Sequence, residues 1–341
     1  MYLNEKRINN LFFYWLTCSL LLVFSIVIVG GLTRLTNSGL SITEWELFKG
    51  IFPPMSSIEW EFYFDKYKEI PQYQILNTNM SLNEFKIIFF WEYYHRILAR
   101  IIGLFFLIPL IFFYLSKKID YKYLNICFVI LALIVIQGVI GWYMVKSGLI
   151  NDITVSHYRL SVHLSTAFII ISTIFWLIKN FVEKKNKIFF KFSTNYLLFQ
   201  FLILIIFIQI IIGAFVSGLD AGRIYQTWPL MGDNYLPNDL VFNNFMNIIE
   251  FDNHSLVQFY HRNLAYLIIF YVLLLSFFIY KKKISLLYKP LIIIIFFLLL
   301  QSILGIFTLV SGLNIYLASL HQITSILLLL SAINLYYLRL K

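Results

Sequence analysis

The histidines of this sequence are its best candidates for chemistry, because imidazole is the commonest metal ligand among side chains. There are six, and four occupy matching places in two halves of the chain: His95 and His163, then His261 and His321. Two imidazoles that face each other across a helical bundle make a bis-histidine haem site. Zinc usually takes three or four protein ligands, so one pair in each half favours a flat porphyrin. A structural hydrogen-bonding role is the alternative.

A carboxylate distinguishes the first half from the second. Glu92 precedes His95 by three residues, and the matching position before His261 holds Gln258. Residues three apart share a helix face, so Glu92 is predicted to lie near the same metal as His95. A carboxylate can take up a proton or stabilise a developing positive charge, and an amide cannot. The first site is therefore predicted to be reactive and the second to serve electron transfer or structure; an ion pair with a nearby arginine is the alternative for Glu92.

The sequence says less about the roles of the other two histidines and of the arginines near the candidate ligands. His157 and His254 have no counterpart in the opposite half, and we expect them in loops or at helix ends. Arg96, Arg159 and Arg262 lie close in sequence to the candidate ligands. They are suited to pair with anionic haem propionates, and placement at a membrane boundary is the alternative.

Eight apolar stretches must position these residues. The chain has 341 residues, of which 60% are hydrophobic and 13% charged, whereas a soluble domain is about half apolar and about a quarter charged. A transmembrane helix needs roughly 20 apolar residues. The stretches cover residues 11–31, 88–115, 121–145, 157–178, 196–217, 256–280, 290–311 and 316–338. They predict an all-α integral membrane protein with eight transmembrane helices, and they exclude a disordered chain, a coiled coil and a nucleic-acid module.

The eight stretches read as two copies of one four-helix unit. Motifs recur in the same order, namely Gly30 with Gly213, Tyr-His-Arg at 94–96 and 260–262, and Ser-Gly-Leu at 147–149 and 311–313. Because each copy has an even number of spans, both copies keep one orientation, as in a parallel repeat. We predict two tandem four-helix bundles, residues 1–180 and 181–341. Gln-x-x-x-Gly occurs at 137–141, 209–213 and 301–305, and we interpret it as close helix packing.

Basic residues predict the topology. They concentrate near both termini and in segments 117–122, 179–191 and 281–289, where only Glu5, Asp120 and Glu183 are acidic. Cytoplasmic loops carry the excess of Lys and Arg, so both termini are predicted to be cytoplasmic. The net charge of +10 is then a consequence of topology. The long polar connections 32–87 and 218–255 are expected to cap the outer face, close to the four candidate ligands.

The sequence resembles the heme A synthase family, in the form found in mitochondria and alphaproteobacteria. The resemblance covers nearly the whole chain and rests on GGLTRLTNSGLSITEW (30–45), WEYYHR (91–96), HYRLSVHLSTAF (157–168), YQTWPLMG (225–232) and VQFYHR (257–262). It implies a multi-pass enzyme of the bacterial inner membrane, with the mitochondrial inner membrane the less favoured location. The implied reaction oxidises the C8 methyl of haem O, through a hydroxymethyl, to the formyl group of haem A for cytochrome oxidase.

The resemblance also implies the site. Glu92, His95 and His163 would be catalytic, with the two histidines on the iron of the substrate haem O in the N-terminal half. His261 and His321 would bind the iron of a haem b cofactor in the C-terminal half. The implied partners are heme O synthase, an electron acceptor and membrane lipid, with no nucleic acid and a homo-oligomer left open. Some bacterial relatives carry a cysteine pair in the first outer loop, but residues 32–87 contain no cysteine.

Two other classes of protein share part of this pattern. A di-haem b-type cytochrome that only transfers electrons would need the four histidines but not the Glu92–Gln258 difference. A small-solute transporter could also contain a repeat, but its sites more often lie near the midplane on broken helices. The haem content of the purified protein separates the three classes.

Overall fold

In the computed structural model, the described residues are 5–44, 49–149, 153–240 and 245–340, and they form helices and connections without a β-strand. Eight of the described helices are long and apolar enough to cross a membrane. A helix satisfies all the hydrogen bonds of its backbone within its own segment, which is what a bilayer demands. The predicted class, an all-α membrane protein with eight spanning helices, is confirmed.

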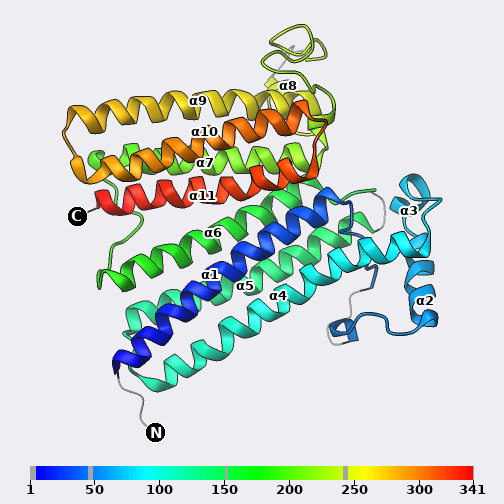
Figure 1. The fold of residues 1–341 in the computed structure, drawn as a ribbon, viewed down its shortest axis with the longest axis horizontal. Helices are drawn as coiled ribbons and strands as arrows, with labels where there is room; N and C mark the ends of the chain where they lie inside the picture. The colour runs from blue at the N-terminus through cyan, green and yellow to red at the C-terminus, as the bar shows by residue number, and fades with distance from the viewer. Residues whose placement is uncertain (1–4, 45–48, 150–152, 241–244, 341) are drawn as a thin grey trace. The chain divides into compact units, whose positions relative to one another are not determined.

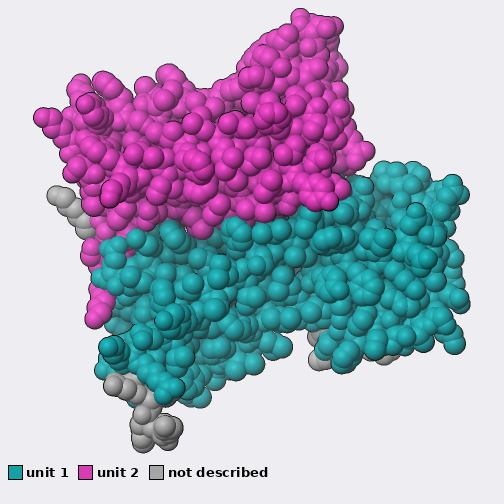
Figure 2. Space-filling view, in the orientation of Figure 1, with its two compact units in different colours: residues 1–183 teal, residues 184–341 magenta. Residues whose placement is uncertain are grey.

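The chain divides into two compact units, residues 1–183 and 184–341 (Figure 2). The first unit is a bundle of α1 (Glu5–Leu35), α4 (Leu82–Ser116), α5 (Tyr121–Gly148) and α6 (His157–Val182). Helix α1 packs against α4 and α6, and α5 packs against the same two helices (Figure 1). Helices α4 and α6 are therefore diagonal partners, and their inward side chains meet in the middle of the bundle.

The second unit repeats this order of neighbours. It contains α7 (Thr194–Gly218), α9 (His254–Lys281), α10 (Tyr288–Val310) and α11 (Ile315–Arg339). Helices α7 and α10 each pack against α9 and α11 (Figure 1), so α9 and α11 are the diagonal pair. The order of neighbours is the one that the predicted repeat requires, and the repeat itself stays a prediction. Trp45, the last residue of the motif at 30–45 on which the family resemblance partly rests, lies outside the described residues.

The connection between α1 and α4 folds into helices of its own at one end of the first bundle (Figure 1). It contains η1 (Lys49–Ile51), α2 (Ser57–Lys68) and α3 (Pro71–Leu76). Capping boxes begin both α2 and α4, with Ser56 paired to Glu59 and Ser81 paired to Glu84. The second box starts α4 at Leu82, ahead of the predicted start at 88, because the capped first turns are too polar to show in an apolar run.

Aromatic side chains hold this connection onto α4. Trp60, Phe64 and Tyr67 of α2 form a buried cluster with Phe85 and Phe89 of α4. Burial raises the pKa of Tyr67 to about 12, so its hydroxyl stays protonated and donates to Gln72 Oε1 at 2.9 Å. The helical part of this connection, residues 57–76, is thus packed as a cap on its bundle.

The connection between α7 and α9 contains less helix, namely η2 (Ala221–Arg223) and α8 (Phe245–Ile248), and a short η3 (Ser285–Leu287) precedes α10. Polar contacts replace the aromatic cluster in the described part of the α7–α9 connection. Asp239 accepts hydrogen bonds from the hydroxyls of Tyr225 and Ser255, both at 2.6 Å. These bonds join the connection to the first turn of α9.

Candidate functional site

Both predicted histidine pairs meet within their bundles. His95 on α4 and His163 on α6 have ring centroids 6.5 Å apart, with an interplanar angle of 66°. His261 on α9 and His321 on α11 have centroids 6.3 Å apart and an angle of 76°. Each pair spans the diagonal of a four-helix bundle, which explains how residues so distant in sequence face each other.

Each of the four imidazoles packs against a glycine of a neighbouring helix. A Cβ atom at that glycine would lie between 2.8 and 3.0 Å from the Cε1 atom of the imidazole. The pairs are Gly30 with His95, Gly141 with His163, Gly213 with His261, and Gly305 with His321. A larger residue would displace the ring, so the glycines set how far each imidazole reaches into its bundle. The sequence predicted close helix packing at Gly141, Gly213 and Gly305, and the structure shows that a histidine is the group packed against each of them.

The separation of the rings suits a single metal ion between two imidazoles. A metal–nitrogen bond is about 2 Å long and the ring centre lies about 1 Å further, so two imidazoles on one metal have centroids about 6 Å apart. Among the described residues, no group of three or more His, Cys, Asp and Glu side chains is arranged to hold a metal. Two imidazoles alone fit a haem iron, whose remaining ligands come from the porphyrin.

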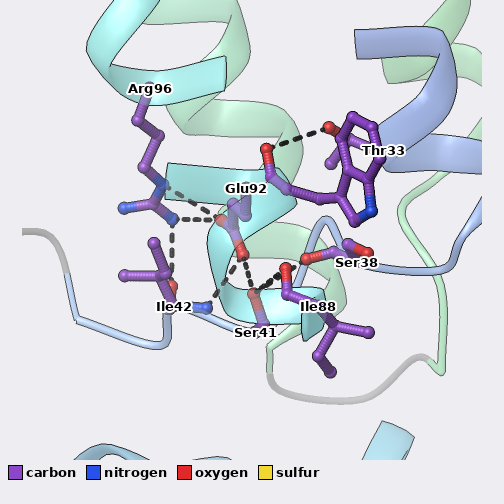
Figure 3. Close-up of polar contacts among 8 residues, drawn as sticks. Thr33, Ser38, Ser41, Ile42, Ile88, Glu92 and Arg96 are labelled. Carbon is purple, nitrogen blue, oxygen red and sulfur yellow. Dashed lines mark hydrogen bonds and ion pairs between the residues drawn. The ribbon is translucent and has the colours of Figure 1, made fainter. Parts of the chain in front are cut away.

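Glu92 lies at the centre of a buried polar network in the first unit (Figure 3). Its side chain is buried, and its Oε1 atom accepts hydrogen bonds from Arg96, at 2.5 Å from Nη2 and 3.0 Å from Nε. Its Oε2 atom accepts from the Ser41 hydroxyl and the Ile42 backbone N–H, both at 2.8 Å. Arg96 also donates to the Ile42 carbonyl at 2.9 Å. The ion pair with a nearby arginine is present, and the carboxylate also ties the chain after α1 to α4.

The second unit contains a counterpart of this network that has no carboxylate. Gln258 Nε2 donates to the Tyr225 carbonyl at 2.9 Å, and Arg262 Nη2 donates to the same oxygen at 2.9 Å. Arg262 Nη1 donates further to the carbonyls of Thr227 and Leu230. An amide and an arginine therefore hold the chain after α7 onto α9 without a carboxylate.

The remaining predicted residues lie at the edges of the bundles. His157 and His254 are the first residues of α6 and α9, as expected; His157 is buried and lies 4.1 Å, centroid to centroid, from Tyr158, whereas His254 is exposed. Arg159 donates a hydrogen bond to the backbone carbonyl of Tyr143, and its guanidinium lies 3.9 Å from the centre of the Tyr143 ring. Pairing of the arginines with propionates stays a prediction.

The sequence reasoning missed the role of the chain just after α1. Ser41 and Ile42 hold the Glu92 carboxylate, yet they lie about 50 residues from it. The only signal was the polar run Thr36–Ser41, which reads equally well as a connecting turn. The reasoning also missed that the glutamines of the Gln-x-x-x-Gly motifs contact the histidines.

Fold and site together define a class: an eight-helix membrane protein in which each four-helix unit presents a histidine pair suited to haem iron. Comparison with known proteins identifies the family to which the chain belongs. The family model described as "Cytochrome oxidase assembly protein" matches residues 13–333, and the chain belongs to this family.

Proteins named "Heme A synthase" are similar to the chain along almost its full length. The one from Pelagibacter ubique is 47% identical over 96% of each chain. The one from Rickettsia felis is 40% identical over 92% of this chain and 94% of its own. The one from Flavobacterium johnsoniae is 39% identical over 95% and 96%, respectively.

Proposed function

We propose that this chain is a heme A synthase, an oxidoreductase that converts haem O to haem A by oxidising the C8 methyl group to a formyl group. The observation that carries the proposal is a histidine pair across each bundle, with the buried carboxylate of Glu92 one helical turn from His95 and the amide of Gln258 in the matching place before His261. Membership of the cytochrome oxidase assembly family and the similarity to proteins named heme A synthase support it. A carrier of electrons alone would have no use for this difference between the units.

The two units take different haems in this proposal. His95 and His163 hold the iron of the substrate haem O in the first unit. His261 and His321 hold a haem b in the second unit, where the bound haem b supplies one-electron redox chemistry. Two successive oxidations of one carbon release electrons, so an electron acceptor is required, and a heme O synthase must supply the substrate.

Glu92 acts on the charge and the proton that the oxidation produces. Loss of electrons at the C8 carbon builds positive charge on the porphyrin edge, and a buried carboxylate stabilises such charge strongly. Its two oxygens have different partners. Oε1 accepts from the Arg96 guanidinium, and Oε2 accepts from the neutral Ser41 hydroxyl and Ile42 N–H. These donors hold the carboxylate in place.

The chain lies in the bacterial inner membrane with both termini in the cytoplasm, as the basic segments near the termini and at 117–122, 179–191 and 281–289 favour. A reporter fused after Lys341 tests this orientation. We expect activity only from a reporter that works in the cytoplasm. Strong activity from a reporter that works only in the periplasm would overturn the topology.

The haem content of the chain tests the proposed activity. The full chain is produced in cells that supply haem O, purified in detergent, and its haems are extracted and identified by mass. We expect haem b together with haem A and hydroxymethyl haem O. Haem b alone would indicate an electron-transfer cytochrome instead, and a chain without haem would leave a transporter.

A further inference from the structure

One end of the second unit, where α7 begins and α11 ends, is basic and has no acidic residue among those described (Figure 1). Its basic residues are in segments 184–191 and 281–289 and at Arg339, whereas all the acidic residues of this unit are in the connection between α7 and α9. The corresponding segments of the first unit do contain acids. Asp120 and Glu183 pair there with Lys122 at 2.8 Å and Lys179 at 3.4 Å. Membrane topology therefore tolerates acids in such segments and does not explain their absence from the second unit.

Three of these lysines line a pocket beside the segment that leads into α7. The pocket has a volume of about 440 Å³, and its walls combine Lys185, Lys187 and Lys191 with Ile188, Phe190 and Leu340. Ammonium groups gathered in one place repel one another, and a bound anion relieves that repulsion. The pocket is therefore suited to an anionic group with an apolar part.

Alternate residues of the segment anchor it on the end of α11. Lys187 Nζ donates hydrogen bonds to the backbone carbonyl of Tyr337, at 2.9 Å, and to that of Leu340. The Phe189 ring packs on Tyr336 with centroids 5.4 Å apart, and the Tyr336 hydroxyl donates to the Phe189 carbonyl at 2.6 Å. These contacts fix the shape of the pocket, because they hold its wall from both the side chains and the backbone.

The residues between these anchors are apolar and exposed. Ile188, Phe190 and Phe192 are 68%, 71% and 79% exposed, and the rings of the two phenylalanines stack with centroids 6.4 Å apart. Successive side chains of an extended segment point to opposite sides, so the three share one side. The segment directly precedes α7, which is long and apolar enough to span a membrane. Aromatic side chains favour this level of a bilayer, where acyl chains can cover them.

We propose that this pocket binds the anionic headgroup of a membrane phospholipid. The phosphate lies near Lys185 and Lys191, and the acyl chains lie along Ile188, Phe190 and Phe192. Basic pockets on the cytoplasmic side of membrane helices recognise such headgroups, and this end is cytoplasmic in the proposed topology. A free phosphate would use the lysines but not the exposed apolar side chains.

The lipid site is separate from the histidine pair of the same unit. His261 packs against Gly213, close to the last residue of α7, whereas the pocket lies beside the first residues of that helix. A helix rises about 1.5 Å per residue, so the two places are about 30 Å apart along α7. Lipid binding can therefore be tested independently of the proposed haem chemistry.

Lipid binding to the purified full chain tests the proposal. The chain is freed of lipid in a neutral detergent and titrated with phosphatidylglycerol or with phosphatidylcholine, and bound lipids are counted by native mass spectrometry. We expect phosphatidylglycerol to bind about tenfold more tightly or better, because only its headgroup carries a net negative charge. Added salt should weaken this preference. Inorganic phosphate at matched ionic strength should not displace the lipid, since it cannot cover Phe190 and Phe192.

A double variant of the pocket measures the contribution of its lysines. Lys185→Gln combined with Lys191→Gln removes two exposed positive charges and no buried contact. Each lysine contributes about fivefold to the binding of an anionic lipid, so phosphatidylglycerol should bind about 25-fold more weakly. The matched control is Lys281→Gln combined with Lys282→Gln, which removes the same charge from the same end of the unit. It should weaken binding by a much smaller factor, because neither lysine lines the pocket.

Three results would overturn the proposal. They are equal affinity of the unchanged chain for the two lipids, equal weakening by the two double variants, and displacement of phosphatidylglycerol by inorganic phosphate. The first and third need no variant, so they decide the question even if a double variant folds poorly. Thermal unfolding and haem content of both double variants should match the unchanged chain. A chain that binds phosphatidylglycerol as expected but carries no haem would overturn the proposed function and leave the lipid site standing.

Discussion

Glu92→Gln should lower the rate of haem A formation by about 10²-fold or more, the scale of lost acid–base catalysis. This corresponds to about 2.7 kcal/mol of lost transition-state stabilisation. The physical reason is that an amide can neither take up a proton as a carboxylate does nor oppose the positive charge that builds on the substrate. Haem O or its hydroxymethyl form should accumulate. Product haems extracted from cells that make the variant give the measurement.

Haem b in the second unit should be retained in the variant, because His261 and His321 are untouched. In the first unit, Ser41, Ile42 and Arg96 all donate to the Glu92 carboxylate, so the amide nitrogen of Glu92→Gln meets donors where the carboxylate met them. Thermal unfolding of the variant measures the cost of this mismatch.

A matched control separates catalysis from structure. Glu84→Gln removes a carboxylate from the same helix, but Glu84 is exposed and only caps α4, so haem A formation should stay near the native rate. If Glu92→Gln makes haem A at the native rate, Glu92 has no catalytic role. If it loses thermal stability and haem b together, Glu92 is a structural partner of Arg96.

His321→Ala and His261→Ala should each abolish the low-spin spectrum of haem b. Each removes one of the two imidazoles that face each other in the second unit. The loss should exceed the roughly 10- to 100-fold weakening that follows from disturbing a residue behind a metal ligand. Absorption spectra and the haem b content per chain measure it. Alanine in place of His321 leaves a space beside Gly305, so added imidazole should restore part of the low-spin spectrum.

His254→Ala is the control for His261→Ala, because His254 is exposed at the start of the same helix. It should keep the native spectrum and haem content. A native low-spin spectrum in both His261→Ala and His321→Ala would show that haem b is bound elsewhere or not at all.

The amino-acid sequence by itself determined the eight spanning helices and the two histidine pairs. Apolar runs of this length can satisfy their backbone in a bilayer only as helices. The recurrence of Tyr-His-Arg at 94–96 and 260–262 then assigned one histidine of each pair to matching helices. The Glu92–Gln258 difference was visible for the same reason, since both residues lie at a fixed spacing from a histidine on the same helix.

Only the tertiary structure decided what surrounds these residues. Ser41 and Ile42 reach the Glu92 carboxylate from a connection about 50 residues away, and local sequence does not specify contacts at that range. The Gln-x-x-x-Gly motif gave the spacing of Gln209 and Gly213 but not the partner they face. That partner depends on how α7 is rotated against α9, which is set by packing of whole helix faces and not by the residues of either helix alone.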